Sequence, residues 1–201
     1  MIKNIIFDVG RVLVDFKPDE IMDQLGIDKD THQLLNKIMF HNPLWNEFDR
    51  STLSADEIEE KFFELAPDKK EIITKVFRKV GDMIETRSYT LPWLQDLKDR
   101  GYHLYILSNY ASYTYGLTKD KLTFLDLMDG IVFSYQCKMI KPERGIYDHL
   151  LQQYHLDPVE CVFLDDREDN IEAGRELGMY GVVFDSFENG SALLENLLQT
   201  K

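Results

Sequence analysis

Five short apolar runs along the chain have the length and composition of buried β-strands. Each run has four or five residues, is rich in β-branched or aromatic side chains, and is too short for a helix. The apolar residues are continuous rather than alternating, as expected for a parallel sheet that is covered on both faces. The runs are Asn4–Asp8, His103–Leu107, Gly130–Phe133, Cys161–Leu164 and Tyr180–Phe184.

Segments with helical periodicity lie between these runs. One of them has Pro92 near its start and Gly101 just past its end, which is typical of a helix. The alternation of strand and helix predicts an α/β fold with an open, doubly wound parallel sheet. The expected helices in this part of the chain are Leu91–Arg100, Glu143–Tyr154, Glu168–Leu177 and Ala192–Leu198.

A long stretch of chain separates the first expected strand from the second. Residues 17–86 carry apolar stripes at helical spacing, and the last stripe runs from Ile73 to Ile84. The run Ser54-Ala-Asp-Glu57 has the form of a capping box at the start of a helix. We therefore expect a helical cap (17–86) inserted into a catalytic core (1–16 and 87–201). The alternative is a set of extra helices in the same domain.

Composition and charge narrow the functional classes. The 201 residues are 44% hydrophobic and 29% charged, with a net charge of −13, so the chain would repel nucleic acid and anionic membrane surfaces. A phosphorylated substrate would need local positive charge. Neither a membrane-length apolar run nor a signal peptide is evident, and the two cysteines lack metal-ligand spacing. We expect a cytoplasmic protein with reduced cysteines.

Polar residues follow each of the first four expected strands, at the edge where ligands bind in open α/β sheets. Clustered carboxylates there would repel one another unless a cation neutralised them, and Mg²⁺ suits oxygen ligands. A serine hydroxyl and a lysine could then hold a phosphate, and a carboxylate could attack it. Each residue alone has an ordinary structural interpretation. The prediction depends on all of them occurring in order, each after an apolar strand. The set is Asp8, Ser108, Asn109, Lys141, Asp165 and Asp166.

The segments around these residues resemble the four motifs of the haloacid-dehalogenase-like hydrolases. FDVGRVLVDF resembles the first motif, LSN the second, KPERGIY the lysine motif and FLDDREDNIEAGRELG the fourth. The resemblance covers nearly the full chain. It implies a phosphate-ester hydrolase whose helical cap shapes substrate choice.

The resemblance also implies a role for each residue. Asp8 would be the nucleophile that forms an aspartyl-phosphate, which Lys141 would stabilise, while Ser108 and Asn109 would bind the phosphoryl group. The cofactor would be Mg²⁺. Its ligands would be Asp8, Asp166, the backbone carbonyl of Gly10, and Asp165 directly or through water.

One position departs from the family pattern. The family's phosphatases usually carry a second Asp two residues after the nucleophile as general acid and base, and this chain has Gly10. The first motif is most similar to a subgroup with Asp-x-Gly, which includes sugar-phosphate phosphatases. A metal-bound water or a cap residue, with His41 as one candidate, could supply the proton. Otherwise we expect a preference for good leaving groups, such as that of a hexose 1-phosphate. The glycine could also serve a positive φ.

Further residues are expected near the substrate. Trp45, Phe48, Asp49 and Arg50 are candidates to line the pocket, although the two aromatic residues also suit a hydrophobic core. Arg11 is interpreted either as a second cation for the phosphate or as a solvated turn residue.

Three functions remain open from the sequence. The leading one is a magnesium-dependent phosphatase for a small phosphorylated metabolite, and a phosphotransferase would use the same residues. The second is a carbon–halogen hydrolase, which the Asp165-Asp166 pair and the lack of the dehalogenases' Asp-x-Tyr-Gly-Thr disfavour. The third is a catalytically weak protein that binds a phosphometabolite or a partner.

Overall fold

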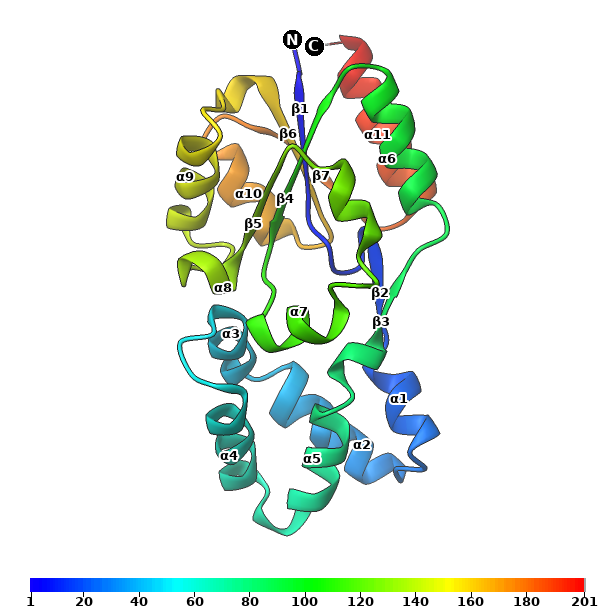
Figure 1. Ribbon diagram of the computed structural model, residues 1–201, viewed down its shortest axis with the longest axis vertical. Helices are drawn as coiled ribbons and strands as arrows, with labels where there is room; N and C mark the ends of the chain where they lie inside the picture. Colours follow the sequence, from blue (N-terminus) through cyan, green and yellow to red (C-terminus); the bar gives the residue numbers. More distant parts are fainter. Residues whose placement is uncertain (201) are drawn as a thin grey trace.

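A parallel five-stranded sheet forms the centre of the computed structural model, which describes residues 1–200 (Figure 1). The strand order is β5-β4-β1-β6-β7, so β1 lies in the middle with Phe7 paired to both Ile106 and Leu164. All five predicted strands are confirmed, with ends that differ by at most one residue. The strands are β1 (Asn4–Phe7), β4 (His103–Ser108), β5 (Gly130–Phe133), β6 (Cys161–Asp165) and β7 (Tyr180–Val183).

Helices cover both faces of the sheet, which explains the continuous apolar strands. Ile5 and Phe7 of β1 pack in a hydrophobic cluster with α6 (Thr90–Asp99) and α11 (Phe187–Thr200). Ile6 points to the opposite cluster, with α9 (Arg144–Gln153) and α10 (Glu168–Arg175). The doubly wound α/β fold is therefore as predicted.

Some core helices differ from the expectation. The last helix, α11, begins at Phe187, five residues before the expected Ala192. Two short helices, α7 (Ser112–Thr118) and α8 (Ser134–Cys137), were not predicted, because they span too few turns for a periodic pattern.

The helical segment (residues 17–86) lies beyond one end of the sheet, facing the carboxyl ends of the strands (Figure 1). It has its own hydrophobic cluster, which includes Met22, Phe62 and Ile73. The capping box is confirmed: Ser54 Oγ accepts from Glu57 N–H, and Glu57 accepts from Ser54 N–H. Its α-helices are α1 (Pro18–Gln24), α2 (Lys29–Leu35), α3 (Pro43–Arg50), α4 (Ala55–Leu65) and α5 (Lys70–Phe77), with a π-helix at Asn36–Phe40.

Two short strands connect the helical segment to the sheet. Strand β2 (Val14–Phe16) pairs antiparallel with β3 (Ile84–Thr86), placing Phe16 opposite Ile84. The predicted helical stripe from Ile73 to Ile84 is therefore wrong in its second half. Helix α5 ends at Phe77, a 3₁₀ turn spans Val80–Met83, and Ile84 enters β3. These apolar residues are buried as expected, but they meet the core in another conformation because the chain must return beside β2.

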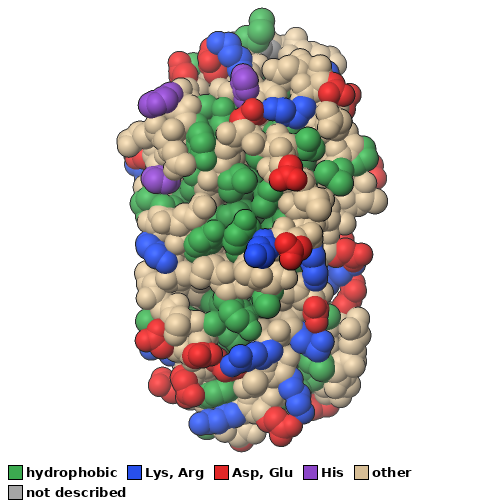
Figure 2. Space-filling view, viewed as in Figure 1, with side chains coloured by type: hydrophobic (Ala, Val, Ile, Leu, Met, Phe, Trp, Pro, Cys, Tyr) green, Lys and Arg blue, Asp and Glu red, His purple; other side chains and the backbone are tan. Residues whose placement is uncertain are grey.

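The surface agrees with the acidic, polar composition. Acidic and basic side chains lie over both the sheet region and the helical segment on the face drawn in Figure 2. Within residues 1–200, no helix has the length and apolar character needed to cross a membrane.

Candidate active site

A cavity of about 520 Å³ lies between the carboxyl ends of the strands and the helical segment. Asp8 follows β1, Ser108 ends β4, and Asp166 follows β6, so parallel strand ends bring these side chains together. The sequence-predicted residues that line the cavity are Asp8, Gly10, Arg11, Trp45, Ser108, Asn109, Lys141 and Asp166. Asp165 lies beneath this wall and is fully buried.

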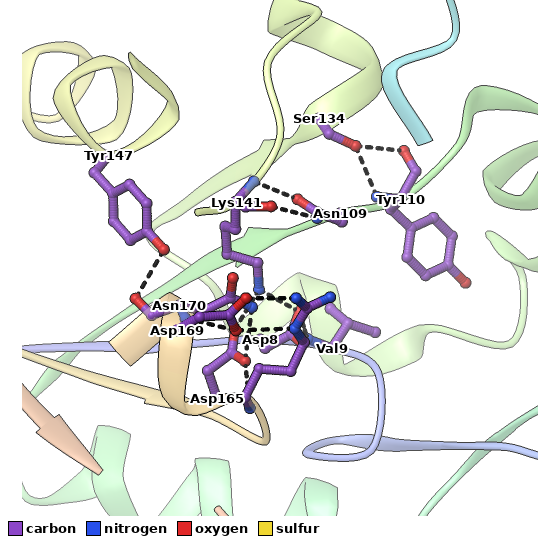
Figure 3. Close-up of polar contacts among 11 residues, drawn as sticks. Asp8, Val9, Asn109, Tyr110, Ser134, Lys141, Tyr147, Asp165, Asp169 and Asn170 are labelled. Atoms are coloured by element: carbon purple, nitrogen blue, oxygen red, sulfur yellow. Dashed lines mark hydrogen bonds and ion pairs between the residues drawn. The ribbon is translucent and has the colours of Figure 1, made fainter. Parts of the chain in front are cut away.

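Lys141 links two of the carboxylates (Figure 3). Its ammonium group lies 2.9 Å from Asp8 Oδ1 and 2.6 Å from Asp165 Oδ2, and the side chain is buried. Burial acts to lower the pKa of Lys141, but the charges of Asp165 and Asp8 outweigh it and raise that pKa above its ordinary value. The lysine therefore stays charged at the bottom of the cavity.

Asn109 holds the loop that carries Lys141. Its side-chain NH₂ donates to the Lys141 carbonyl at 3.1 Å, and its Oδ1 accepts from the Lys141 N–H at 2.8 Å (Figure 3). This pair of bonds fixes the lysine backbone relative to the end of β4. Binding of Asn109 to a phosphoryl group stays a prediction.

Both oxygens of the Asp165 carboxylate have hydrogen-bond donors. Oδ2 accepts from Lys141, while Oδ1 accepts from the Arg167 N–H and from Asn170 Nδ2, each at 2.9 Å. Asn170 is held in turn, because Tyr147 Oη donates to its carbonyl at 2.8 Å. Asn170 was not among the residues predicted for the site, and it is buried there. Its place five residues after Asp165, next to the apolar Ile171, is a sequence signal that could have indicated this role.

The three carboxylates form a group suited to a cation. Oxygen atoms of Asp8, Asp165 and Asp166 all lie within 4.8 Å of one another. Burial raises the pKa of Asp8 to about 6, and the charge of Asp165 adds to the effect, although Lys141 opposes it. Burial likewise raises the pKa of Asp166, with Asp165 adding. Three carboxylates share one buried lysine, Lys141, and the mostly exposed Arg11, so a bound cation would neutralise the remaining negative charge.

Two further features fit a hard cation with oxygen ligands. Within residues 1–200, the nearest basic partner of Asp166 is Arg11, at 3.5 Å, and the Arg11 side chain is mostly exposed. Asn170 Oδ1 is buried and has no hydrogen-bond partner in the described chain. The donors are carboxylate and amide oxygens, which Mg²⁺ prefers.

Gly10 is not required by the backbone. A positive φ was one expectation for this position, and it is wrong: the positive value belongs to the next residue, Arg11, at 60°. A Cβ atom added to Gly10 would have no heavy atom within 4 Å. Both the conformation and the space at position 10 therefore admit a side chain.

Residues of the helical segment form the opposite wall of the cavity. Trp45 lines it and packs against Phe40, with ring centroids 4.9 Å apart. His41 also lines it, and its ring Nδ1 donates to the Asn36 carbonyl at 3.0 Å. The expectation that Phe48 and Arg50 line the pocket is wrong, because Phe48 is buried in the cluster of the helical segment and Arg50 points to the core.

Helix α3 is bound to the core at its carboxyl end. Arg50 Nη1 donates to Glu143 at 2.8 Å, and Lys138 Nζ donates to the Ser51 carbonyl at 2.6 Å. Ser134 Oγ donates to the Asp49 carbonyl at 2.7 Å. These bonds, called here the α3–core contact, fix Asp49 at the rim of the site.

Asp49 also lines the cavity and is half-buried. Burial raises the pKa of its carboxyl to about 8, and the charge of Asp8 adds to this effect while Lys141 opposes it. Within residues 1–200 the side chain has no hydrogen-bond or ion-pair partner. The sequence pointed to Asp49 only as a pocket residue.

Comparison with known proteins agrees with this arrangement. The family model for haloacid dehalogenase-like hydrolases matches residues 2–178. The chain is 31% identical to D-ribitol-5-phosphate phosphatase of Bacteroides thetaiotaomicron, covering 95% of this chain and 94% of the relative. It is 27% identical to a sesquiterpene phosphatase of Aspergillus oryzae, covering 90% and 88%.

A solved structure has the same fold. It is a HAD-family enzyme of Bacteroides thetaiotaomicron in complex with magnesium and inorganic phosphate, with a TM-score of 0.76, 22% identity, and coverage of 96% of this chain and 99% of that one. The matched motifs, the sheet order and the extent of these alignments lead to one conclusion. This chain belongs to the haloacid dehalogenase-like hydrolases.

Proposed function

We propose that the protein is a magnesium-dependent phosphatase that hydrolyses a small phosphorylated metabolite through an aspartyl-phosphate at Asp8. One observation carries this proposal: a buried lysine joins Asp8 to Asp165, and these two residues form a cluster of three carboxylates with Asp166. A lone nucleophilic carboxylate would need no such cluster. Two of the proteins that this chain resembles are phosphatases, which supports the same reaction.

The nucleophile is oriented by its neighbours. Asp8 Oδ1 accepts from the Val9 N–H at 2.8 Å and lies beside Lys141, while Ser108 also hydrogen-bonds the Asp8 carboxylate. Lys141 lowers the cost of bringing a phosphate dianion to an anionic nucleophile. Ser108, which is almost fully buried, is placed to donate to a phosphoryl oxygen.

The magnesium ion would be held by Asp8, Asp166 and the backbone carbonyl of Gly10. Asp165 would act through water, because both its oxygens already accept hydrogen bonds. When bound, the ion supplies positive charge that neutralises the carboxylates and the phosphate. The unpartnered Asn170 Oδ1 could accept from a water in this shell.

For the substrate we propose a sugar or polyol phosphate, with a hexose 1-phosphate among the first to test. The cavity wall offers the ring of Trp45 beside the polar side chains of His41 and Asn46, which suits a hydroxylated carbon skeleton. The D-ribitol-5-phosphate phosphatase relative points to the same substrate class. Residues 17–86 would act as a cap that selects the substrate.

The test is hydrolysis of a phosphate-ester panel by the purified protein. The panel would hold ribitol 5-phosphate, a hexose as its 1- and 6-phosphate, and 4-nitrophenyl phosphate, and chloride release from 2-chloropropionate would test the dehalogenase alternative separately. We expect phosphate release that stops with a chelator and returns with Mg²⁺, and loss of several orders of magnitude in Asp8→Asn.

Asp15→Asn is the matched control. Asp15 lies in the same first segment, but it pairs with Arg87 at 2.9 Å and does not line the catalytic cavity. This variant should keep near-normal activity. Release that survives exhaustive chelation, or full activity of Asp8→Asn, would refute the proposed mechanism.

A further inference from the structure

A leaving alkoxide needs a proton, and the first motif provides no acid for it. Gly10 has no side chain; it lines the cavity, and the space beside it is open. Lys141 and Asp165 are bonded to each other at the bottom of the site. The proton must then come from a metal-bound water or from another group of the cavity wall.

Asp49 differs from the other carboxylates of the site. Asp8 and Asp165 are paired with Lys141, and Asp166 is paired with Arg11. Asp49 has a fixed backbone, held by Ser134, but its side chain has no partner within residues 1–200. The Asp49 oxygens are not among the buried unpartnered atoms of residues 1–200, so they are accessible from the cavity to a group that enters it.

We propose that Asp49 is the general acid and base of the reaction, supplying from helix α3 the carboxyl that position 10 lacks. This inference rests on the proposed phosphatase function. It assigns the second catalytic carboxyl to the helical segment rather than to the first motif.

The electrostatic setting is consistent with this role. Burial raises the pKa of Asp49 to about 8, with the charge of Asp8 adding and Lys141 opposing. A raised pKa favours the protonated carboxyl, which is the form that a general acid needs.

The other proton donors of the cavity fit less well. His41 is exposed at the rim, and its Nδ1 already donates to the Asn36 carbonyl. Tyr110 is buried with its hydroxyl bonded to Thr118, and burial raises its pKa to about 12. In both residues a hydrogen bond within the protein already engages the polar group.

Asp49 would act in both steps of the reaction. The Asp8 carboxylate forms a bond to phosphorus while the bond to the ester oxygen breaks, and that oxygen takes the proton of Asp49 to leave as an alcohol. The Asp49 carboxylate then accepts a proton from the water that attacks the phosphoaspartate. Inorganic phosphate leaves, and Asp8 and Asp49 return to their starting states.

In this arrangement, catalysis depends on the position of helix α3. In the α3–core contact, the two residues directly after Asp49 are bonded to the core: Arg50 to Glu143 and Ser51 to Lys138. The acid therefore reaches the phosphate only when α3 is docked on the core. The preference for good leaving groups, expected from Gly10 alone, should then appear in an Asp49 variant rather than in the natural protein.

The experiment uses substituted phenyl phosphates of similar size but different leaving-group basicity, together with ribitol 5-phosphate. The variants are Asp49→Asn, the double variant Asp49→Asn/Gly10→Asp, and Glu47→Gln. Glu47 lies on the same helix outside the cavity and pairs with Arg50, so it controls for charge loss on α3. Thermal unfolding checks that each variant is folded.

We expect kcat/KM of Asp49→Asn to fall by about 10²- to 10³-fold on ribitol 5-phosphate but by less than about tenfold on 4-nitrophenyl phosphate. Its kcat/KM should depend more steeply on leaving-group basicity than that of the natural protein. The double variant should restore the shallow dependence, because position 10 has room for the acid. Glu47→Gln should behave as the natural protein.

Equal loss on good and poor leaving groups would overturn the role of Asp49, as would no loss at all. Those outcomes presuppose an active natural protein. Absence of magnesium-dependent turnover in the natural protein would refute the proposed function instead, so the two failures are distinguishable.

Discussion

Replacing Lys141 with methionine tests whether this lysine stabilises the folded protein by neutralising the buried carboxylates of the site. Methionine has a similar length and is apolar, so the change removes the charge and leaves the packing largely filled. Lys141 is 2% exposed, Asp165 is fully buried and Asp8 is 8% exposed. The substitution therefore leaves two buried carboxylates without their shared partner.

The expected cost follows from these contacts. Lys141 makes ionic hydrogen bonds of 2.6 Å and 2.9 Å, and removing one partner of a buried ion pair costs about 3–5 kcal/mol. Asp165 keeps its bonds from Arg167 and Asn170, which places the estimate near the lower end. In a chain of this size, such a loss lowers Tm by on the order of 10 °C.

The measurement is urea unfolding at pH 7.5 with a chelator present, followed by far-UV circular dichroism. Lys75→Met is the control, because Lys75 makes an exposed pair with Glu71 that solvent screens. The loss in Lys141→Met should shrink as the pH falls. Burial already raises the pKa of Asp8 above its unfolded value, and loss of the lysine removes the charge that opposes this rise, so the penalty is present at high pH and absent below about pH 4. A variant within about 1 kcal/mol of the natural protein at pH 7.5 would refute this reasoning.

Three further predictions concern the cation and the pocket. Asp166→Asn should weaken Mg²⁺ binding by roughly 100-fold, measured by calorimetric titration, while the unfolding free energy without metal changes little or rises. Burial raises the pKa of Asp8 to about 6, and only the carboxylate binds the ion. Mg²⁺ affinity should therefore fall about tenfold per pH unit below 6. Binding should also release a proton, which calorimetry in buffers of different ionisation enthalpy detects. A constant affinity between pH 5 and 7 would contradict it. Trp45→Ala should change the ranking of sugar phosphates more than it changes turnover of 4-nitrophenyl phosphate, and equal losses on all substrates would mean that Trp45 serves only packing.

Much of the catalytic edge could be predicted from the sequence for a local reason. Strands buried on both faces need continuous apolar residues, so the run before Asp8 and the run before Asp165 locate two strand ends directly. Parallel strands then bring those ends to one edge whatever the length of the chain between them. The same logic placed Ser108 and Lys141 in the cavity.

The partners of each side chain were not predictable in this way, because they depend on contacts between residues far apart in the chain. Nothing local shows that Asn170 is held by Tyr147 and in turn holds Asp165, or that the positive φ belongs to Arg11 rather than Gly10. Strand β3 has only three residues and forms because β2 lies beside it, so its one apolar residue, Ile84, looked like the end of a helical stripe.

The sequence by itself determined the apolar strands, most apolar helix faces and the polar groups at the strand ends, because burial on a strand or helix leaves a periodic pattern. Only the tertiary structure decided which carboxyl groups of the cavity are free to react. Asp165 is saturated by its neighbours, whereas Asp49 is brought over the site by the docking of α3 and left without a partner. That difference arises from how the helical segment packs on the sheet, and packing between distant segments leaves no periodic trace in the chain.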